Sequence, residues 1–206
     1  MTDGASIENG VTTALSALDI EASALSVAKA RVSGQMAAAL ELLHRAAGRV
    51  IVSGIGKSGH IGAKIAASLA STGTPAFFIH STEALHGDSG MVTGDDAAIL
   101  ISNSGETAEV LAFGQMLAAW GVPIIALTGG EGSTLAKLAK VTLDVSVAAE
   151  ADPLGLAPTA STTCTLAVGD ALAAGLMAIN GFTPGDFHQR HPGGSLGKLL
   201  DDGRAA

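Results

Sequence analysis

Glycines, a lysine and a serine stand together where the first apolar run of the sequence ends. Residues 50–52 (Val-Ile-Val) predict a buried parallel strand, and an apolar-periodic helix pattern follows the turn. Gly54 and Gly56 allow the backbone to approach a ligand, and Lys57 adds a positive charge. Ser58 is expected to cap the helix, whose first-turn N–H groups attract an anion. This stretch predicts a phosphate site.

A second turn of the same kind follows the third apolar run. The segment Ser102-Asn-Ser-Gly-Glu-Thr107 again places hydroxyls and a glycine before a helix pattern. The carboxyl ends of parallel strands meet at one edge of a sheet, where ligands bind. The two turns are therefore expected to wrap one phosphate, with Ser102, Ser104 and Thr107 and backbone N–H groups as its ligands.

Glutamates and histidines near the strand ends supply acid–base chemistry. Glu150 ends the fifth strand and is the preferred general base, whereas Glu109 opens a helix, where the helix dipole alone favours an acid. His191 precedes Pro-Gly-Gly, a rigid turn that is typical of a residue reaching into a site. His80 and His86 have a spacing that could share a metal, which is a weak signal.

Three other interpretations of the motifs are disfavoured by the surrounding sequence. The segment 54–59 matches the dinucleotide fingerprint, but the second strand ends in Ile79-His80 instead of an acidic ribose ligand. A P-loop would need a glycine at position 51, which is Ile51. Residues 87–90 (Gly-Asp-Ser-Gly) resemble a serine-protease nucleophile segment, whose chemistry on that motif needs an all-β scaffold.

The elements that must position these residues alternate after Gly48. Near-continuous apolar strands separated by helices predict an α/β fold, a three-layer α-β-α sandwich with a five-stranded parallel sheet of flavodoxin-like or Rossmann-like type. The expected strands are 50–53, 76–79, 97–102, 123–128 and 141–147. The expected helices are 61–71, 107–120, 133–139 and 161–180.

The chain before this core is expected to form a tail and helices. Residues 1–12 are interpreted as a loose N-terminal tail. Leucines at helical spacing predict one or two long helices over 13–47, with Gly34 as a break. Residues 48–206 hold the doubly wound core and the C-terminal segment, and no linker marks a second domain. The prediction is therefore one domain over 13–206.

Composition disfavours several classes of function. The 206 residues carry 11 basic and 19 acidic side chains, a net charge of −8, which gives no basic footprint for nucleic acid or an anionic membrane. Cys164 is the only cysteine, so no disulfide framework is expected and a reducing cytoplasm fits. The first ten residues lack a signal-peptide pattern, and the apolar stretches are interpreted as too short to span a bilayer.

Six segments together resemble the sugar isomerase (SIS) domain of arabinose-5-phosphate isomerases. They are residues 56–62, 70–75, 86–92, 101–106, 153–159 and 191–194, and they occur in the family's order over about residues 50–200. The resemblance implies interconversion of D-ribulose 5-phosphate and D-arabinose 5-phosphate, the first step toward Kdo, a sugar of Gram-negative lipopolysaccharide. Many members carry a pair of cystathionine-β-synthase-type modules after this domain. This sequence resembles the short members, so regulation through such modules is not expected.

The same resemblance implies roles for individual residues. The positions that match the catalytic set are Lys57, Glu109, Glu150 and His191, and those that match substrate contacts are Gly73, Thr74 and His86. His80 falls where a metal ion has been associated with the family. Zinc bound there is expected to be adventitious or inhibitory, because the reaction class requires no cofactor. The resemblance also implies a homotetramer with sites between subunits, and leaves open whether His191 acts in its own subunit or in a neighbouring one.

These residue types are consistent with an aldose–ketose isomerisation through a cis-enediol. His191 would open the furanose ring, and Glu150 would move a proton between C2 and C1, best with a pKa raised by burial. Lys57 would stabilise the enediolate oxygen, and Glu109 would orient Lys57 or a hydroxyl. Two alternatives stay open: an isomerase of a heptose or hexulose phosphate, and a non-catalytic phosphosugar sensor like that of SIS transcription regulators.

Overall fold

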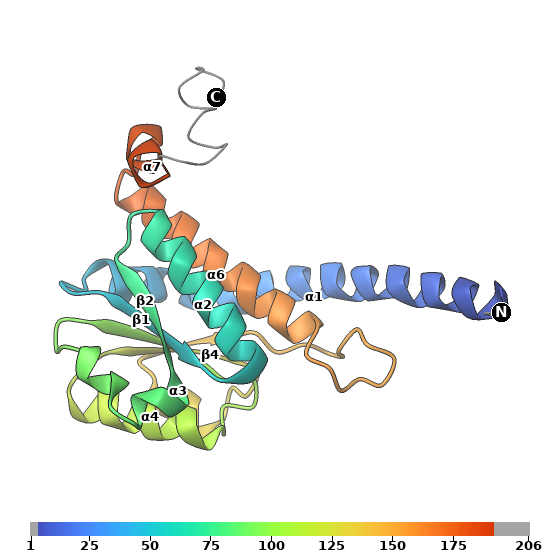
Figure 1. Cartoon of the computed structure of the whole chain (residues 1–206), viewed down its shortest axis with the longest axis horizontal. Helices are drawn as coiled ribbons and strands as arrows, with labels where there is room; N and C mark the ends of the chain where they lie inside the picture. Colours follow the sequence, from blue (N-terminus) through green and yellow to red (C-terminus); the bar gives the residue numbers. More distant parts are fainter. Residues whose placement is uncertain (1–3, 192–206) are drawn as a thin grey trace.

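A parallel sheet between two layers of helices forms the body of the protein (Figure 1). The computed structural model describes residues 4–191. The strand order is β2-β1-β3-β4-β5, and every neighbouring pair is parallel. The strands are β1 (Val50–Gly54), β2 (Ala76–His80), β3 (Ala97–Ile101), β4 (Ile124–Thr128) and β5 (Val141–Asp144). The predicted α/β fold with a five-stranded parallel sheet is confirmed.

Seven helices and one 3-10 turn surround the sheet within residues 4–191. They are α1 (Gly4–His44), α2 (Gly56–Ser71), α3 (Ser81–Ala84), η1 (Asp88–Met91), α4 (Ala108–Ala119), α5 (Thr134–Leu138), α6 (Ala160–Ile179) and α7 (Pro184–Arg190). The sequence patterns predicted α1, α2, α4, α5 and α6 but not α3, η1 and α7. A capping box between Thr183 and Asp186 starts α7, with Pro184 in its first turn.

The central strands are apolar on both faces, and this sorts their side chains into two cores. All residues of β1, β3 and β4 are buried. Val50 and Val52 belong to the core under α1, α2 and α6, whereas Ile51 belongs to the core under α4 and α5. Alternate strand residues point to opposite faces, so a continuous apolar run is what a sheet covered by helices on both sides requires.

The strand order reverses its direction at the carboxyl ends of β1 and β3. The chain leaves β1 through α2 to reach β2 on one side, and leaves β3 through α4 to reach β4 on the other. Ser53 is in register with Leu100 of β3, and Gly54 is in register with His80 of β2. This reversal of direction is the switch point at which open α/β sheets bind ligands.

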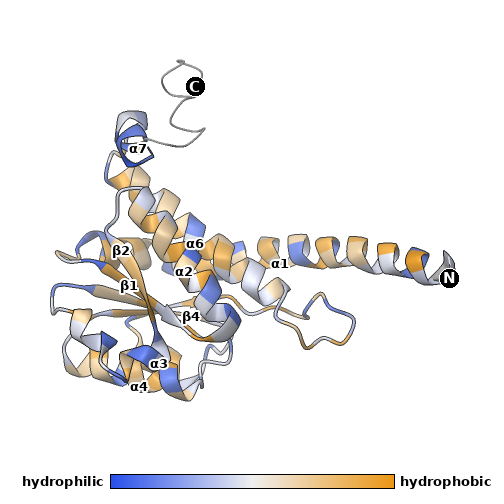
Figure 2. Cartoon of the chain, in the orientation of Figure 1, coloured by the Kyte–Doolittle hydropathy of each residue, from blue (hydrophilic) through white to orange (hydrophobic). Residues whose placement is uncertain are grey.

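The first helix differs from its prediction. α1 runs without interruption over 41 residues, so the expected tail is helical from Gly4 and Gly34 does not break the helix. A Cβ at Gly34 would meet nothing within 4 Å, so this glycine is a weak helix former on an open surface. Ala28, Val32 and Leu43 are buried against the body. The N-terminal part of α1 projects beyond the body, with apolar residues on its surface (Figures 1 and 2).

Two helices are long and apolar enough to cross a membrane by length and composition, residues 6–44 and α6. The expectation that every apolar stretch is too short for a bilayer is therefore wrong. The apolar window of α6 is 39% buried, since α6 packs against both α1 and α2. The window of α1 is 6% buried. The core helix of a water-soluble protein passes the same test, so this criterion is weak evidence for a membrane span.

Candidate active site at the carboxyl end of the sheet

The turn from β1 to α2 needs glycine for steric reasons. A Cβ on Gly54 would lie 3.1 Å from the carbonyl oxygen of Ile101 on β3. Gly56 has a φ of +54° and begins α2. The N-cap is Ile55, without a side-chain cap, so the prediction that Ser58 caps the helix is wrong. Ser58 lies instead inside the first turn of α2, whose N–H groups remain available to an anion.

The turn from β3 to α4 is held by its own hydroxyls. Ser102 and Thr107 share a hydrogen bond of 2.8 Å between their hydroxyls, and the N–H of Gly105 donates to Ser102 Oγ at 3.1 Å. The Ser104 hydroxyl accepts a hydrogen bond from the N–H of Glu106, two residues further along the turn. A serine hydroxyl has one proton and two lone pairs, so these groups can still contact a phosphate after shaping the turn.

Glu150 is the most heavily hydrogen-bonded side chain of the site. Its Oε2 accepts from the N–H of Thr159 at 2.8 Å, from the Thr159 hydroxyl at 3.1 Å and from the N–H of Ser161 at 3.1 Å. Its Oε1 accepts from the Ser161 hydroxyl. Since α6 begins at Ala160, the carboxylate closes the loop between β5 and α6 and caps the first turn of α6.

These hydrogen bonds set the charge of Glu150. Burial opposes ionisation of the carboxyl, but the donors on Ser161 and Thr159 outweigh it and hold the pKa of Glu150 below its ordinary value. The expectation that burial raises the pKa of Glu150 is therefore wrong, whereas its role as a general base stays a prediction. At neutral pH, Glu150 is an ionised group that accepts hydrogen bonds from Thr159 and Ser161.

Glu109 has different surroundings. It is the second residue of α4, directly after Thr107 and Ala108, and is partly buried. Within residues 4–191 no hydrogen bond or ion pair joins it to another side chain, so the expected contact with Lys57 is absent. Lys57 is exposed in the first turn of α2. Both residues lie at the switch point, and neither charged group forms an ion pair within residues 4–191.

Two histidines follow the same edge of the sheet. His80 ends β2 beside Gly54, and its Nδ1 is buried without a hydrogen-bond partner. His86 is exposed after α3, where its N–H donates to the carbonyl of Glu83. No group of three or more histidine, cysteine or acidic side chains that could hold a metal occurs in the described part of the chain. Neither histidine thus belongs to a metal-binding cluster among the described residues.

Three of the predicted site residues lie at the opposite end of the sheet. Gly73 (φ +105°) and the buried Thr74 precede β2, and a Cβ on Gly73 would clash with the ring of Phe182. His191 follows α7, stacks on Phe187 at 3.9 Å between ring centroids, and its Nδ1 lies 2.9 Å from the Phe187 carbonyl oxygen. The Pro-Gly-Gly segment after His191 lies outside the described residues.

The length of α6 keeps the two groups apart. Glu150 is bound to the first turn of α6, whereas α7 and His191 come after its last turn (Figure 1). Twenty helical residues span about 30 Å. One chain therefore brings together Lys57, the two hydroxyl turns and the glutamates, but it does not bring His191, Gly73 or Thr74 to them.

Sequence reasoning missed the residues that hold Glu150 in place. Thr159 and Ser161 flank the start of an apolar helix, which is the usual signal for capping residues. Arg31 was missed as well: it donates to the carbonyl of Ser146 at 2.5 Å and lies 3.6 Å from the Asp144 carboxylate. It thereby fixes the chain leaving β5 toward Glu150, a contact 115 residues away in sequence that no local pattern announces.

A parallel α/β sheet with two glycine–hydroxyl turns at its switch point defines a class of domains that bind phosphorylated ligands. Comparison with known protein families identifies which of these domains the chain contains. The SIS domain family matches residues 42–175, and the chain belongs to this family.

Individual relatives narrow the comparison. The chain is 52% identical to the arabinose 5-phosphate isomerase KdsD of Pseudomonas aeruginosa over 183 residues, which are 89% of this chain and 56% of that protein. It is 54% identical to KpsF of Escherichia coli O6:H1 over 168 residues, 82% of this chain and 51% of that one. The chain thus spans about half the length of the curated relatives it matches.

One similar solved structure matches almost the whole of this chain. The E. coli CFT073 protein c3406, determined in complex with A5P, superposes with a TM-score of 0.86 at 41% identity. The match covers 93% of this chain and 100% of that chain. The SIS fold predicted from the sequence segments is therefore confirmed.

Proposed function

We propose that the chain is an arabinose-5-phosphate isomerase that interconverts D-ribulose 5-phosphate and D-arabinose 5-phosphate. The observation that carries the proposal is the pair of glycine–hydroxyl turns at the switch point, in a chain about half identical to the isomerases KdsD and KpsF. The structure of the similar protein c3406 contains A5P, a ligand of the class that we propose as the substrate.

The phosphate would bind where the two turns meet. The uncapped first turn of α2, at Gly56 and Ser58, offers N–H donors to the phosphate oxygens. The hydroxyls of Ser102, Ser104 and Thr107 would line the other side. Gly54 lets this turn pack directly against the end of β3, because a Cβ there would meet the carbonyl oxygen of Ile101.

A complete site requires a second subunit in this proposal. His191, Gly73 and Thr74 lie at the far end of α6, so a neighbouring chain must contribute them to the Lys57 end. A homotetramer with sites between subunits satisfies this requirement. His191 from the neighbour would open the furanose ring of the aldose, and His86 would contact the substrate.

The isomerisation itself is a proton transfer between adjacent carbons. A carboxylate removes a C1 proton of the ketose, and the electrons move onto the C2 oxygen to give a cis-enediolate. The proton of the C1 hydroxyl then passes to the C2 oxygen, and the carboxyl group returns a proton to C2 as the carbonyl forms at C1. Glu109 takes this role because its carboxylate accepts no hydrogen bond, whereas Glu150 holds the loop around the substrate. Lys57 stabilises the enediolate oxygen, and removing such a donor costs about 2.7–4 kcal/mol.

The proposed isomerisation requires no cofactor, since only protons move between C1, C2 and their oxygen atoms. Zinc bound at His80 would be adventitious or inhibitory. The product fits the first step toward Kdo, and a phosphorylated pentose does not cross a membrane unaided, so the proposed enzyme acts in the cytoplasm without nucleic acid or membrane partners.

Isomerisation in deuterated water tests the proposal. Ribulose 5-phosphate should yield arabinose 5-phosphate with deuterium at C2, because the proton on the carboxylate exchanges with solvent. Folded protein that binds pentose phosphates without converting them would refute the enzyme and indicate a sensor. Conversion of a hexulose or heptose phosphate in preference would change the substrate and keep the mechanism.

A further inference from the structure

The β3–α4 turn, residues 102–107, is fastened at its end to the neighbouring helix α5. Oε1 of Glu106 accepts a hydrogen bond of 2.7 Å from the N–H of Thr134. Beside it, the N–H of Leu135 donates to the carbonyl oxygen of Gly105 at 3.1 Å. Two consecutive residues of the turn are thus joined to two consecutive residues of α5.

The start of the same turn is fastened to the segment that follows β4. The N–H of Gly129 donates to the carbonyl oxygen of Asn103 at 2.9 Å, and the Thr128 hydroxyl donates to the same oxygen at 3.3 Å. The N–H of Gly130 donates in turn to Thr128 Oγ1 at 3.1 Å. The turn is therefore held from outside at both of its ends.

The two segments approach so closely that glycine is needed where they meet. Gly105 has a φ of +67°, which favours glycine, and a Cβ on it would overlap the side chain of Ser133. A Cβ on Gly130 would lie 2.6 Å from the carbonyl oxygen of Ser104, closer than carbon and oxygen pack. This fit leaves the β3–α4 turn one position against the residues before α5.

Glu106 links this support to a hydroxyl of the predicted phosphate site. Its side chain binds α5, and its own N–H donates to Ser104 Oγ at 3.2 Å. Because a lone pair of the Ser104 hydroxyl takes that N–H, the hydroxyl proton points elsewhere and is available to a phosphate oxygen. Displacement of Glu106 would therefore also change the direction of this donor.

Capping of α5 does not by itself explain the contact. Ser133 is already the N-cap, and its hydroxyl accepts from the N–H of Ala136 at 3.2 Å. The hydrogen bond from the N–H of Thr134 lowers the pKa of Glu106, so the carboxylate is ionised at neutral pH. Hydrogen bonds to a charged acceptor are stronger than those to a neutral one, which suits an exposed anchor.

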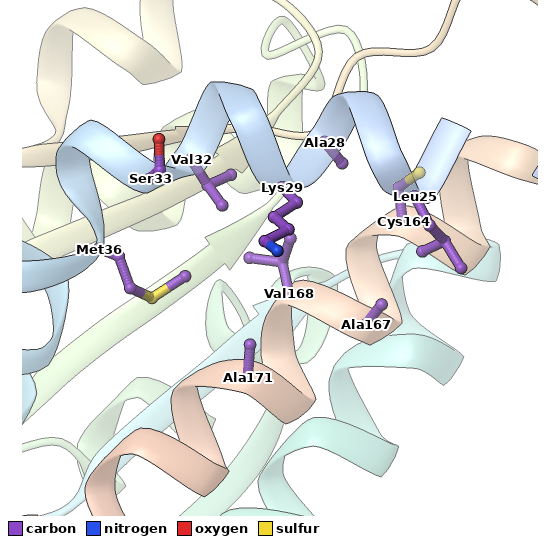
Figure 3. A pocket seen from close by; sticks show the side chains of 10 residues that line it. All are labelled: Leu25, Ala28, Lys29, Val32, Ser33, Met36, Cys164, Ala167, Val168 and Ala171. Carbon is purple, nitrogen blue, oxygen red and sulfur yellow. The ribbon is translucent and has the colours of Figure 1, made fainter. Parts of the chain in front are cut away.

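The anchor lies on the side of the sheet that α4 and α5 cover. Leu135, next to the anchored N–H, is buried in the core on that side. The apolar groove between α1 and α6 has a volume of about 410 Å³ and lies on the other side, where Val32 and Val168 line it (Figure 3). A substitution at Glu106 leaves this groove unchanged, so an effect on ligand affinity would arise at the turn.

We propose that Glu106 is a positioning residue for phosphate recognition, and that its carboxylate fixes the β3–α4 turn on α5 so that the Ser104 hydroxyl faces the substrate phosphate. This role depends on the proposed phosphate site at the two turns. A turn that is already ordered need not be ordered on binding, and preorganisation of this kind raises affinity. The proton transfer takes place at Glu109 and Lys57, so loss of the anchor should weaken binding and leave kcat nearly unchanged.

Calorimetric titration with arabinose 5-phosphate tests the anchor without turnover. Glu106→Ala should raise the Kd at least about fivefold. Glu106→Gln keeps an acceptor oxygen for the N–H of Thr134, so its Kd should lie between those of wild type and Glu106→Ala. Glu131→Ala is the matched control, since it removes the same charge from an exposed residue before α5 and should keep the wild-type Kd.

Three results of this titration would overturn the proposal. They are a Kd of Glu106→Ala within about twofold of wild type, an equal rise in Glu131→Ala, and a Glu106→Gln protein that binds as weakly as Glu106→Ala. Wild type that binds arabinose 5-phosphate without converting it would refute the proposed enzyme, and the comparison of Kd values would still decide the role of Glu106.

Steady-state kinetics separates positioning from a general structural role. Glu106→Ala should raise the KM for ribulose 5-phosphate at least about fivefold and keep kcat within about threefold of wild type. A double-mutant cycle with Ser104→Ala should give a combined loss of kcat/KM smaller than the sum of the two free-energy changes, because Glu106 acts through this hydroxyl. Full additivity, or a loss confined to kcat, would overturn the proposal.

Discussion

Glu150 and Glu109 stand at the start of two helices on the same edge of the sheet, yet their surroundings differ. Glu150 accepts four hydrogen bonds from Thr159 and Ser161 and caps α6. Glu109 accepts none within the described residues and lies at the switch point. A carboxylate that accepts several hydrogen bonds organises the protein around it, whereas one without partners is available to a substrate. Position at a strand end therefore does not decide which glutamate moves a proton.

Replacing Glu109 by glutamine tests whether this carboxylate moves the proton. We expect kcat to fall by about 10²–10⁴ because the proton acceptor is removed. The free energy of unfolding should change by no more than about 0.5 kcal/mol, since no contact is lost. Initial rates with ribulose 5-phosphate and urea denaturation measure the two quantities. Retained activity would exclude Glu109 as the base.

Glu150→Gln should have the opposite profile. The amide NH₂ faces a donor, so at least one buried hydrogen bond is lost and the free energy of unfolding should fall by about 1–3 kcal/mol. Urea denaturation provides the value, and Glu106→Gln is the matched control, an exposed glutamate that accepts from one backbone N–H of α5. A Glu150→Gln protein as stable as wild type would contradict the anchoring role.

Acid should remove the difference between wild type and Glu150→Gln. Because folding lowers the pKa of Glu150, its ionised form stabilises the protein fully above the unfolded pKa of about 4.3, and this contribution is lost as pH falls through the folded pKa. The gap in unfolding free energy should therefore be widest near neutral pH and shrink below about pH 4.3. A series of urea titrations on both proteins measures it. Asp186 and Glu106, whose pKa values are also lowered, cancel in the difference. A gap that widens with acid would show that the sign is wrong.

The smallest effect is expected for Ser161→Ala. It removes one hydroxyl donor to Glu150 and leaves the two backbone N–H donors, so the loss of stability should be about 0.5–1.5 kcal/mol. Combining it with Glu150→Gln in a double-mutant cycle should give a smaller effect than the sum, because both changes break the same contact. Full additivity would mean that the two side chains do not interact.

The sheet is predictable from the sequence, but the short helices and the start of α1 are not. β1, β3 and β4 are uninterrupted apolar runs, and burial on both faces requires such runs. The four residues of α3 and the seven of α7 contain too few turns to show a period, although the five-residue α5 was predicted. The start of α1 was predicted to be a tail because Gly4 and Gly10 are weak helix formers. Ile7 and Val11 nevertheless continue the helical spacing of apolar residues.

For the site, the residue types were predictable and their contacts were not. The glycines and hydroxyls of the two turns follow from local patterns. The partners of Glu150 lie nine and eleven residues further along the chain, and only the folded loop brings them to the carboxylate. The lowered pKa of Glu150 depends on those donors, so the expectation of a raised pKa considered burial without them.

The length of α6 has a genetic consequence. In the proposed assembly each chain supplies Glu109 to one site and His191 to another, so a defect in either residue is not confined to its own chain. Two alleles that are each inactive, one altered at Glu109 and the other at His191, would complement one another when expressed together. About a quarter of the sites in randomly mixed assemblies would then receive both intact halves.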